Sequence, residues 1–176
     1  VRYPEYSSYN ASSKGVKALY LLIEKMGYQV GQYKQTAGHL PDSATLIAVK
    51  PDINSFNDVQ ERKSLQNWIN RGNALMIVDD FSNLGKYNLD KFRVTDAMNY
   101  EDIANVYSIG KGIIIYMNNP DSYTNNGLKA IEPGVAFINM LDTAKSKRVL
   151  FDEYYHGMTE NSLTLWDLLG QTGRLV

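Results

Sequence analysis

The stretch that decides the fold is TLIAVKPDINSFNDVQERKSLQNWINRGNALMIVDD, residues 45–80. It begins with a compact apolar run of strand length, Thr45 to Val49, and ends with a second one, Ala74 to Val78. Between these runs, a helical pattern that Gly72 closes carries four apolar residues on one face: Val59, Leu65, Trp68 and Ile69. Strand, helix and strand in this order are typical of a parallel α/β sheet.

Capping residues and glycines predict where the helices begin and end. Ser12 and Ser13 are expected to cap a first helix, which Gly27 ends in a left-handed conformation. Ser55 and Asp58 resemble a capping box at the start of the second helix. Two helices with defined ends therefore flank the first predicted strands.

The rest of the chain alternates in the same way, with one exception. Val106 to Ile109 and Ile113 to Met117 flank Gly110-Lys111-Gly112, which predicts an antiparallel β-hairpin. Residues 81–104 lack a clear period and are expected to form loops with short elements. The remaining expected elements are strands over Tyr28–Tyr33 and Val149–Phe151, helical pieces over Thr124–Ala130 and Val135–Leu141 separated by Pro133-Gly134, and a final helix through Leu163, Leu165, Trp166, Leu168 and Leu169.

These elements predict one α/β domain over residues 1–176, with an open, mostly parallel sheet of the flavodoxin-like kind, helices on both faces and one antiparallel hairpin. The length of 176 residues suits a single domain with a real core. The chain starts at Val1 in a polar segment and stops soon after an amphipathic stretch, so we expect an excised piece of a protein whose membrane segments lie outside this window.

Composition excludes several classes of protein. The 18 Lys and Arg balance 19 Asp and Glu, and no run of five like charges occurs, which argues against a nucleic-acid partner. The longest apolar runs are far shorter than the roughly 18–20 residues of a membrane span. Because the chain has no Cys, disulfides, thiolate metal sites and cysteine nucleophiles are excluded.

Polar residues follow three of the predicted strands. Asp79-Asp80 follows Ala74 to Val78, Asn118-Asn119 follows the hairpin, and the run FDEYYHG spans residues 151–157. In open α/β sheets, ligands bind outside the carboxyl ends of the strands. If these strands are neighbours, up to four carboxylates and one imidazole converge on one edge.

The FDEYYHG run allows two interpretations. Glu153 and His156 could act as general base and orienter, or bind a divalent cation with Asp79 or Asp152. In the other interpretation, which we favour, Asp152 or Glu153 caps a turn, His156 bonds to the backbone and Gly157 supplies a positive φ. Likewise, Asp79-Asp80 either binds Mg²⁺ or, as we favour, starts a loop.

Several short motifs together carry a resemblance to a known family. They are Ser7-Ser8 with Asn10, the run Gly15 to Tyr20, Trp68 with Arg71-Gly72, Gly110-Lys111-Gly112, Thr124-Asn125 and FDEYYHG. In this order, over nearly the whole chain, they resemble the uncharacterised bacterial and archaeal family called domain of unknown function forty-three fifty. The family often has His where Tyr155 stands, and this departure weakens a metal site built on two histidines.

The resemblance implies a class I glutamine amidotransferase-like α/β sandwich, placed after a membrane anchor and outside the cytoplasm. It implies no activity, because none is established for the family. A glutamine amidotransferase needs a Cys nucleophile, and this chain has none, so amidotransferase or cysteine peptidase activity is not expected.

We therefore expect a non-catalytic, extracytoplasmic domain of a membrane-anchored bacterial protein that binds a small ligand or a partner protein, without cofactor or bound metal. The expected binding residues are Asp79, Asp80, Asn125, Asp152, Glu153, His156 and Gly157. One alternative is a metal-dependent hydrolase that uses the acidic residues with His156. Another is a cytoplasmic interaction module.

Overall fold

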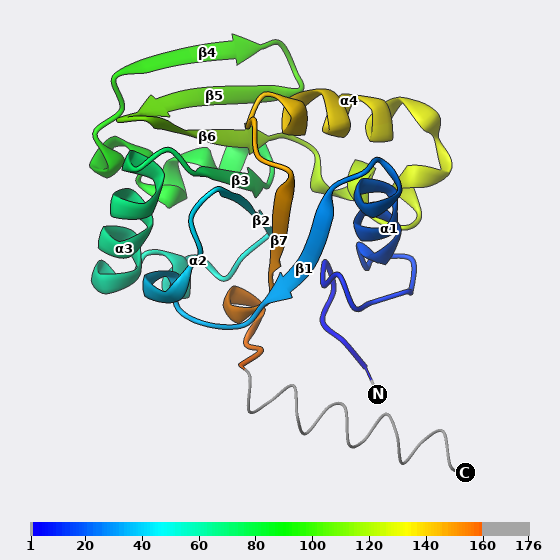
Figure 1. Cartoon of the computed structure of the whole chain (residues 1–176). Coiled ribbons are helices and arrows are strands. Elements are labelled where there is room, and N and C mark those ends of the chain that lie inside the picture. The colour runs from blue at the N-terminus through cyan, green and yellow to red at the C-terminus, as the bar shows by residue number, and fades with distance from the viewer. Residues whose placement is uncertain (1, 160–176) are drawn as a thin grey trace.

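The computed structural model describes residues 2–159 as short strands joined by helices and 3₁₀ turns (Figure 1). The α-helices are α1 (Lys17–Lys25), α2 (Ile53–Phe56), α3 (Val59–Asn70) and α4 (Ile131–Asp142). The strands are β1 (Gln29–Tyr33), β2 (Ala44–Val49), β3 (Ala74–Val78), β4 (Asp96–Tyr100), β5 (Ala104–Ile109), β6 (Gly112–Met117) and β7 (Arg148–Asp152). The 3₁₀ turns are η1 (Ala37–His39), η2 (Phe81–Tyr87), η3 (Leu89–Phe92), η4 (Pro120–Tyr123), η5 (Gly127–Lys129) and η6 (Tyr154–His156).

Within these residues, the strands form one sheet in the order β1-β7-β2-β3-β6-β5-β4. The strands from β1 to β6 in this order are parallel, β5 pairs antiparallel with β6, and β4 pairs antiparallel with β5. The predicted α/β fold with a mostly parallel sheet is confirmed. The sequence predicted one hairpin, whereas the structure has two antiparallel pairs. The prediction missed β4 because this strand is exposed along its whole length and shows no burial pattern.

Both faces of the sheet are covered, and β2 shows how (Figure 1). Every residue of β2 is buried, and alternate side chains belong to different core clusters. Leu46 packs in the cluster that contains Trp68 of α3, whereas Ile47 packs in the cluster that contains Leu19 of α1 and Phe137 of α4. An apolar strand without alternation is therefore the sequence signature of this central position.

The helix ends follow the predictions only in part. Gly27 and Gly72 have positive φ and end α1 and α3 as expected. The predicted capping by Ser12 and Ser13 is wrong, because α1 begins at Lys17 without a side-chain cap, and Ser12 instead donates to Asn10. The predicted capping box is wrong as well, since Ser55 lies inside the short helix α2.

Aspartates cap the two helices that replace the single predicted one. Asp52 accepts hydrogen bonds from the backbone N–H and hydroxyl of Ser55 at the start of α2. Asp58 accepts from the backbone N–H groups of Gln60 and Glu61 at the start of α3. The chain turns between the two helices, so each needs a cap of its own.

The predicted break at Pro133-Gly134 is also wrong, because α4 runs through both residues. Pro133 lies in the first turn of α4, where its missing N–H would have had no partner inside the helix. Gly134 is buried, and a Cβ there would lie 3.1 Å from the side chain of Leu22 in α1. The glycine therefore allows α4 to approach α1 closely.

Residues 81–104, which were expected to form loops with short elements, lie within the described part of the chain. In residues 81–104, the turns η2 and η3 bury Tyr87 and Phe92 against the α3 face of the sheet. The predicted helix through Leu163 and Leu169 lies outside the described residues. Between residues 2 and 159, no helix is long and apolar enough to cross a membrane.

Candidate functional site

The carboxyl ends of the parallel strands lie along one edge of the sheet. In the register, Ile47 of β2 is opposite Phe151 of β7, Val49 is opposite Val78 of β3, and Val78 is opposite Met117 of β6. The polar residues that follow β7, β3 and β6 therefore share this edge, with β2 between β7 and β3. We call it the carboxyl edge.

Glu153 lies at the end of β7 with its side chain only 1% exposed. Its Oε1 accepts hydrogen bonds from both the backbone N–H and the hydroxyl of Ser8, each at 2.7 Å. Its Oε2 lies 3.3 Å from Nδ1 of His156. The carboxylate thus joins the N-terminal segment to the turn η6 after β7.

His156 completes this connection to β2. Its Nε2 lies 2.6 Å from the carbonyl oxygen of Val49, and its side chain is 6% exposed. A carbonyl and a carboxylate only accept hydrogen bonds, so this geometry favours the imidazolium form of His156, in which both ring nitrogens donate. Burial lowers the pKa of His156, but the hydrogen bond and charge of Glu153, the charge of Asp152 and the Val49 carbonyl outweigh it and raise the pKa above its usual value.

An imidazolium with both N–H groups bonded has no lone pair with which to take a proton or bind a metal. Among residues 2–159, no group of three or more His, Asp or Glu side chains is arranged to hold a metal ion. As the favoured interpretation proposed, His156 bonds to the backbone.

Asp152 is buried directly before Glu153 and behaves differently. Burial raises the pKa of the Asp152 carboxyl to about 8; the charge of His156 opposes this shift, and the charge of Glu153 adds to it. Oδ2 of Asp152 accepts a hydrogen bond from the backbone N–H of Tyr155 at 3.1 Å, which stabilises the turn that follows.

Asp79 is buried at the end of β3, and both its oxygens have internal partners. Its Oδ1 accepts from the backbone N–H of Asp80 at 2.8 Å and from Asn83 at 3.0 Å, and its Oδ2 accepts from the hydroxyl of Tyr87 at 2.6 Å. Asp79 therefore organises the loop η2, as expected for a residue that starts a loop. Asp80 is half-buried and begins the same loop.

Asn125 and Gly157 have structural surroundings of their own. The side chain of Asn125 accepts from the backbone N–H of Ala18 at 2.7 Å and donates to the carbonyls of Asn10 and Ser12 at 2.9 and 2.6 Å. It thus holds the loop before α1. Gly157 has a φ of 82° and closes the turn η6, as its predicted positive φ requires.

The structure adds three residues to this edge that the sequence analysis did not single out. The hydroxyl of Tyr6 donates to Asp121 at 2.6 Å, and Nζ of Lys50 lies 5.4 Å from the centre of the Tyr6 ring. Burial, Asp121 and other nearby carboxylates, including that of Asp80, raise the pKa of Tyr6. The sequence holds no signal for this group, because its members are 44 or more residues apart.

The fold and site define a mixed α/β domain whose strand-end polar residues bond mainly to backbone groups and side chains of the same chain. The family model described as Domain of unknown function (DUF4350) matches residues 8–101, more than half of the chain. The chain belongs to this family. No curated protein matches the chain, and no solved structure does.

Removal of the Glu153 carboxylate is expected to destabilise the fold strongly. The substitution Glu153→Ala leaves the buried imidazolium of His156 without its counter-charge, which should lower the free energy of unfolding by about 3–5 kcal/mol. In the control Glu5→Ala, the lost ion pair with Lys14 is exposed, so the change should be about 0–1 kcal/mol. Urea denaturation followed by circular dichroism measures both, and equal losses would contradict the prediction.

Asp152 is expected to make the fold less stable as pH rises. Between the usual carboxyl pKa of 3.8 and about 8, the folded protein holds a proton that the unfolded chain releases, so stability falls across this window. Asp152→Asn should reduce that fall by an amount on the order of a few kcal/mol. Denaturation between pH 4 and pH 9 tests this, with the exposed Asp90→Asn as control; superimposable wild-type and Asp152→Asn curves would refute it.

Proposed function

We propose that this chain is a non-catalytic domain that binds a small ligand or a partner protein at the carboxyl edge of its sheet. One observation carries the proposal. Both oxygens of Glu153 and both ring nitrogens of His156 are bonded within the protein, so the residues best suited to acid–base chemistry serve the fold. Loops at the carboxyl ends of parallel strands remain the usual place for a ligand.

The proposal includes an architecture of the flavodoxin-like or class I glutamine amidotransferase-like kind, kept without amidotransferase chemistry. The mostly parallel sheet with helices on both faces supports it. The absence of Cys from the sequence supports the loss of the chemistry, because that reaction depends on a thiolate.

We place the domain on the extracytoplasmic side of a bacterial membrane, attached through segments that lie outside residues 1–176. This location rests on the family resemblance, whose members usually follow a membrane anchor. A cytoplasmic interaction module is the competing location.

A ligand screen by NMR tests the proposed function. In a ¹⁵N-labelled protein, a bound ligand should shift the amide signals of carboxyl-edge residues such as Lys50, Asp80 and Glu153. The amides of Gly72 and Lys111, at the opposite edge, should stay unchanged and serve as the internal control. The ligand's own spectrum should show no chemical conversion.

Three results would overturn this assignment. Shifts confined to the opposite edge would refute the location of the site. Turnover of a ligand would refute a non-catalytic role. Turnover that requires a divalent ion and is lost in Glu153→Gln, with the fold intact by circular dichroism, would establish the metal-dependent hydrolase instead.

The location has a separate test that uses the lack of Cys. Ser82→Cys places one thiol at an exposed position in an otherwise Cys-free domain. In the parent protein in intact cells, a membrane-impermeant maleimide should label this thiol as fully as it does after detergent treatment. Labelling only after detergent treatment would place the domain in the cytoplasm.

A further inference from the structure

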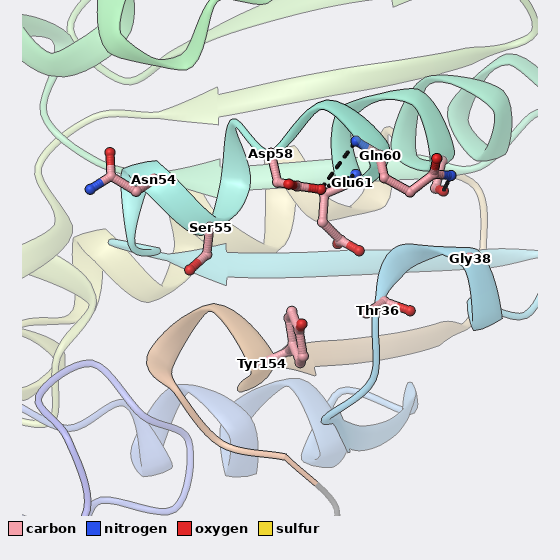
Figure 2. A pocket seen from close by; sticks show the side chains of 9 residues that line it. Thr36, Gly38, Asn54, Ser55, Asp58, Gln60, Glu61 and Tyr154 are labelled. Carbon is pink, nitrogen blue, oxygen red and sulfur yellow. Dashed lines mark hydrogen bonds between the residues drawn. The ribbon is translucent and has the colours of Figure 1, made fainter.

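A polar pocket lies beside the carboxyl edge on the α3 face, between η1, the first turns of α3 and Tyr154 (Figure 2). Its volume is about 590 Å³, within the range of roughly 300–1,000 Å³ that is typical of small-molecule sites. Its walls come from the segments that follow β1, β2 and β7, which are neighbours in the sheet. None of these residues was predicted to bind a ligand.

The charge of the pocket is one-sided. Its described lining includes the carboxylates of Asp58 and Glu61 and no Lys, Arg or His. The N-terminus of α3 would ordinarily attract an anion through its free N–H groups. Here Asp58 already accepts from the N–H groups of Gln60 and Glu61, each at 3.1 Å, so this end of the helix is occupied.

Glu61 is the most informative residue of the pocket, because it is a carboxylate with only 6% exposure. Its oxygens share the backbone N–H of Ala37 at 3.2 and 3.1 Å, and Oε2 also accepts from the hydroxyl of Tyr155 at 2.7 Å. Among the described residues, no cationic side chain forms an ion pair with it. Two neutral donors leave part of its capacity of about four hydrogen bonds unused.

The remaining walls suit a cation with polar substituents. Figure 2 shows the Glu61 carboxylate directed from α3 toward Thr36 and Tyr154. The ring of Tyr154 is half-buried, lines the pocket and packs edge-on against Tyr155, with ring centres 5.7 Å apart. An aromatic face beside a carboxylate attracts an organic cation.

We propose that this pocket binds a small organic cation, a molecule with an ammonium or guanidinium group that pairs with Glu61. This inference rests on the proposed function, since it names the ligand class for the same edge of the sheet. A buried carboxylate gains most from a partner of opposite charge, and the ligand supplies the charge that the described residues lack.

Calorimetric titration with agmatine, which carries both cationic groups, tests the proposal. Agmatine should bind, whereas 1,4-butanediol and succinate, which are neutral and anionic, should not. Absence of agmatine and putrescine binding, or preferential binding of succinate, would overturn the proposal. Binding of Ca²⁺ that competes with agmatine would replace the organic cation with a metal ion and overturn it as well.

Matched variants locate the site. Glu61→Gln keeps acceptor and shape but removes the charge, so it should weaken agmatine binding at least about tenfold. Glu132→Gln makes the same change on α4, on the other face of the sheet, and should have no effect. Gly38→Leu should block the pocket, because a Cβ there meets no atom closer than Ser64 Oγ, at 3.8 Å, and a longer side chain extends into the cavity.

Circular dichroism establishes whether each variant is folded. If Glu61→Gln does not fold, Gly38→Leu alone tests whether agmatine binds in this pocket. Agmatine affinity unchanged in Gly38→Leu would place the cation elsewhere and refute the site. The NMR screen separates this inference from the proposed function. A different ligand or a protein bound at the carboxyl edge, together with failed amine titrations, would remove only the cation assignment.

Discussion

The buried carboxylate of Glu153 is the constraint on which the functional edge of this protein depends. It accepts two hydrogen bonds from Ser8 and faces the imidazolium of His156, which in turn donates to the carbonyl of Val49. A buried charge is costly unless it is paired and hydrogen-bonded. The N-terminal segment, the turn after β7 and the end of β2 are therefore held together by one ion pair with its hydrogen bonds.

Other acidic residues of the carboxyl edge are also tied to the surrounding protein. Asp79 organises the loop after β3, and burial raises the pKa of the Asp152 carboxyl. Glu61 also accepts hydrogen bonds only from neutral groups of the described protein, but its side chain borders a pocket. Asp79 also has neutral partners, but it is not among the residues that line this pocket, so our proposal of a ligand concerns Glu61.

Much of the fold was predictable, because a strand buried on both faces is apolar along its length and glycines with positive φ follow α1 and α3. The sequence predicts β2, β3 and the hairpin β5–β6 at nearly their observed bounds. The errors have local causes. Ser55 resembles a helix cap, but Asp52 is the residue that caps α2. Pro133 suggests a break, but it lies in the first turn of α4, where proline is tolerated. The strand β4 was missed because it is fully exposed and has no apolar pattern.

The sequence by itself determined the mostly parallel α/β sheet, the strand ends on which polar residues lie and the absence of cysteine chemistry, because these follow from local periodicity and composition. Only the tertiary structure decided what the polar residues do. Glu153 and its partner Ser8 are 145 positions apart, and Glu61 and Tyr155 are 94 apart. Hydrogen-bond partners at such separations are brought together by the packing of the sheet, so local sequence patterns cannot identify them.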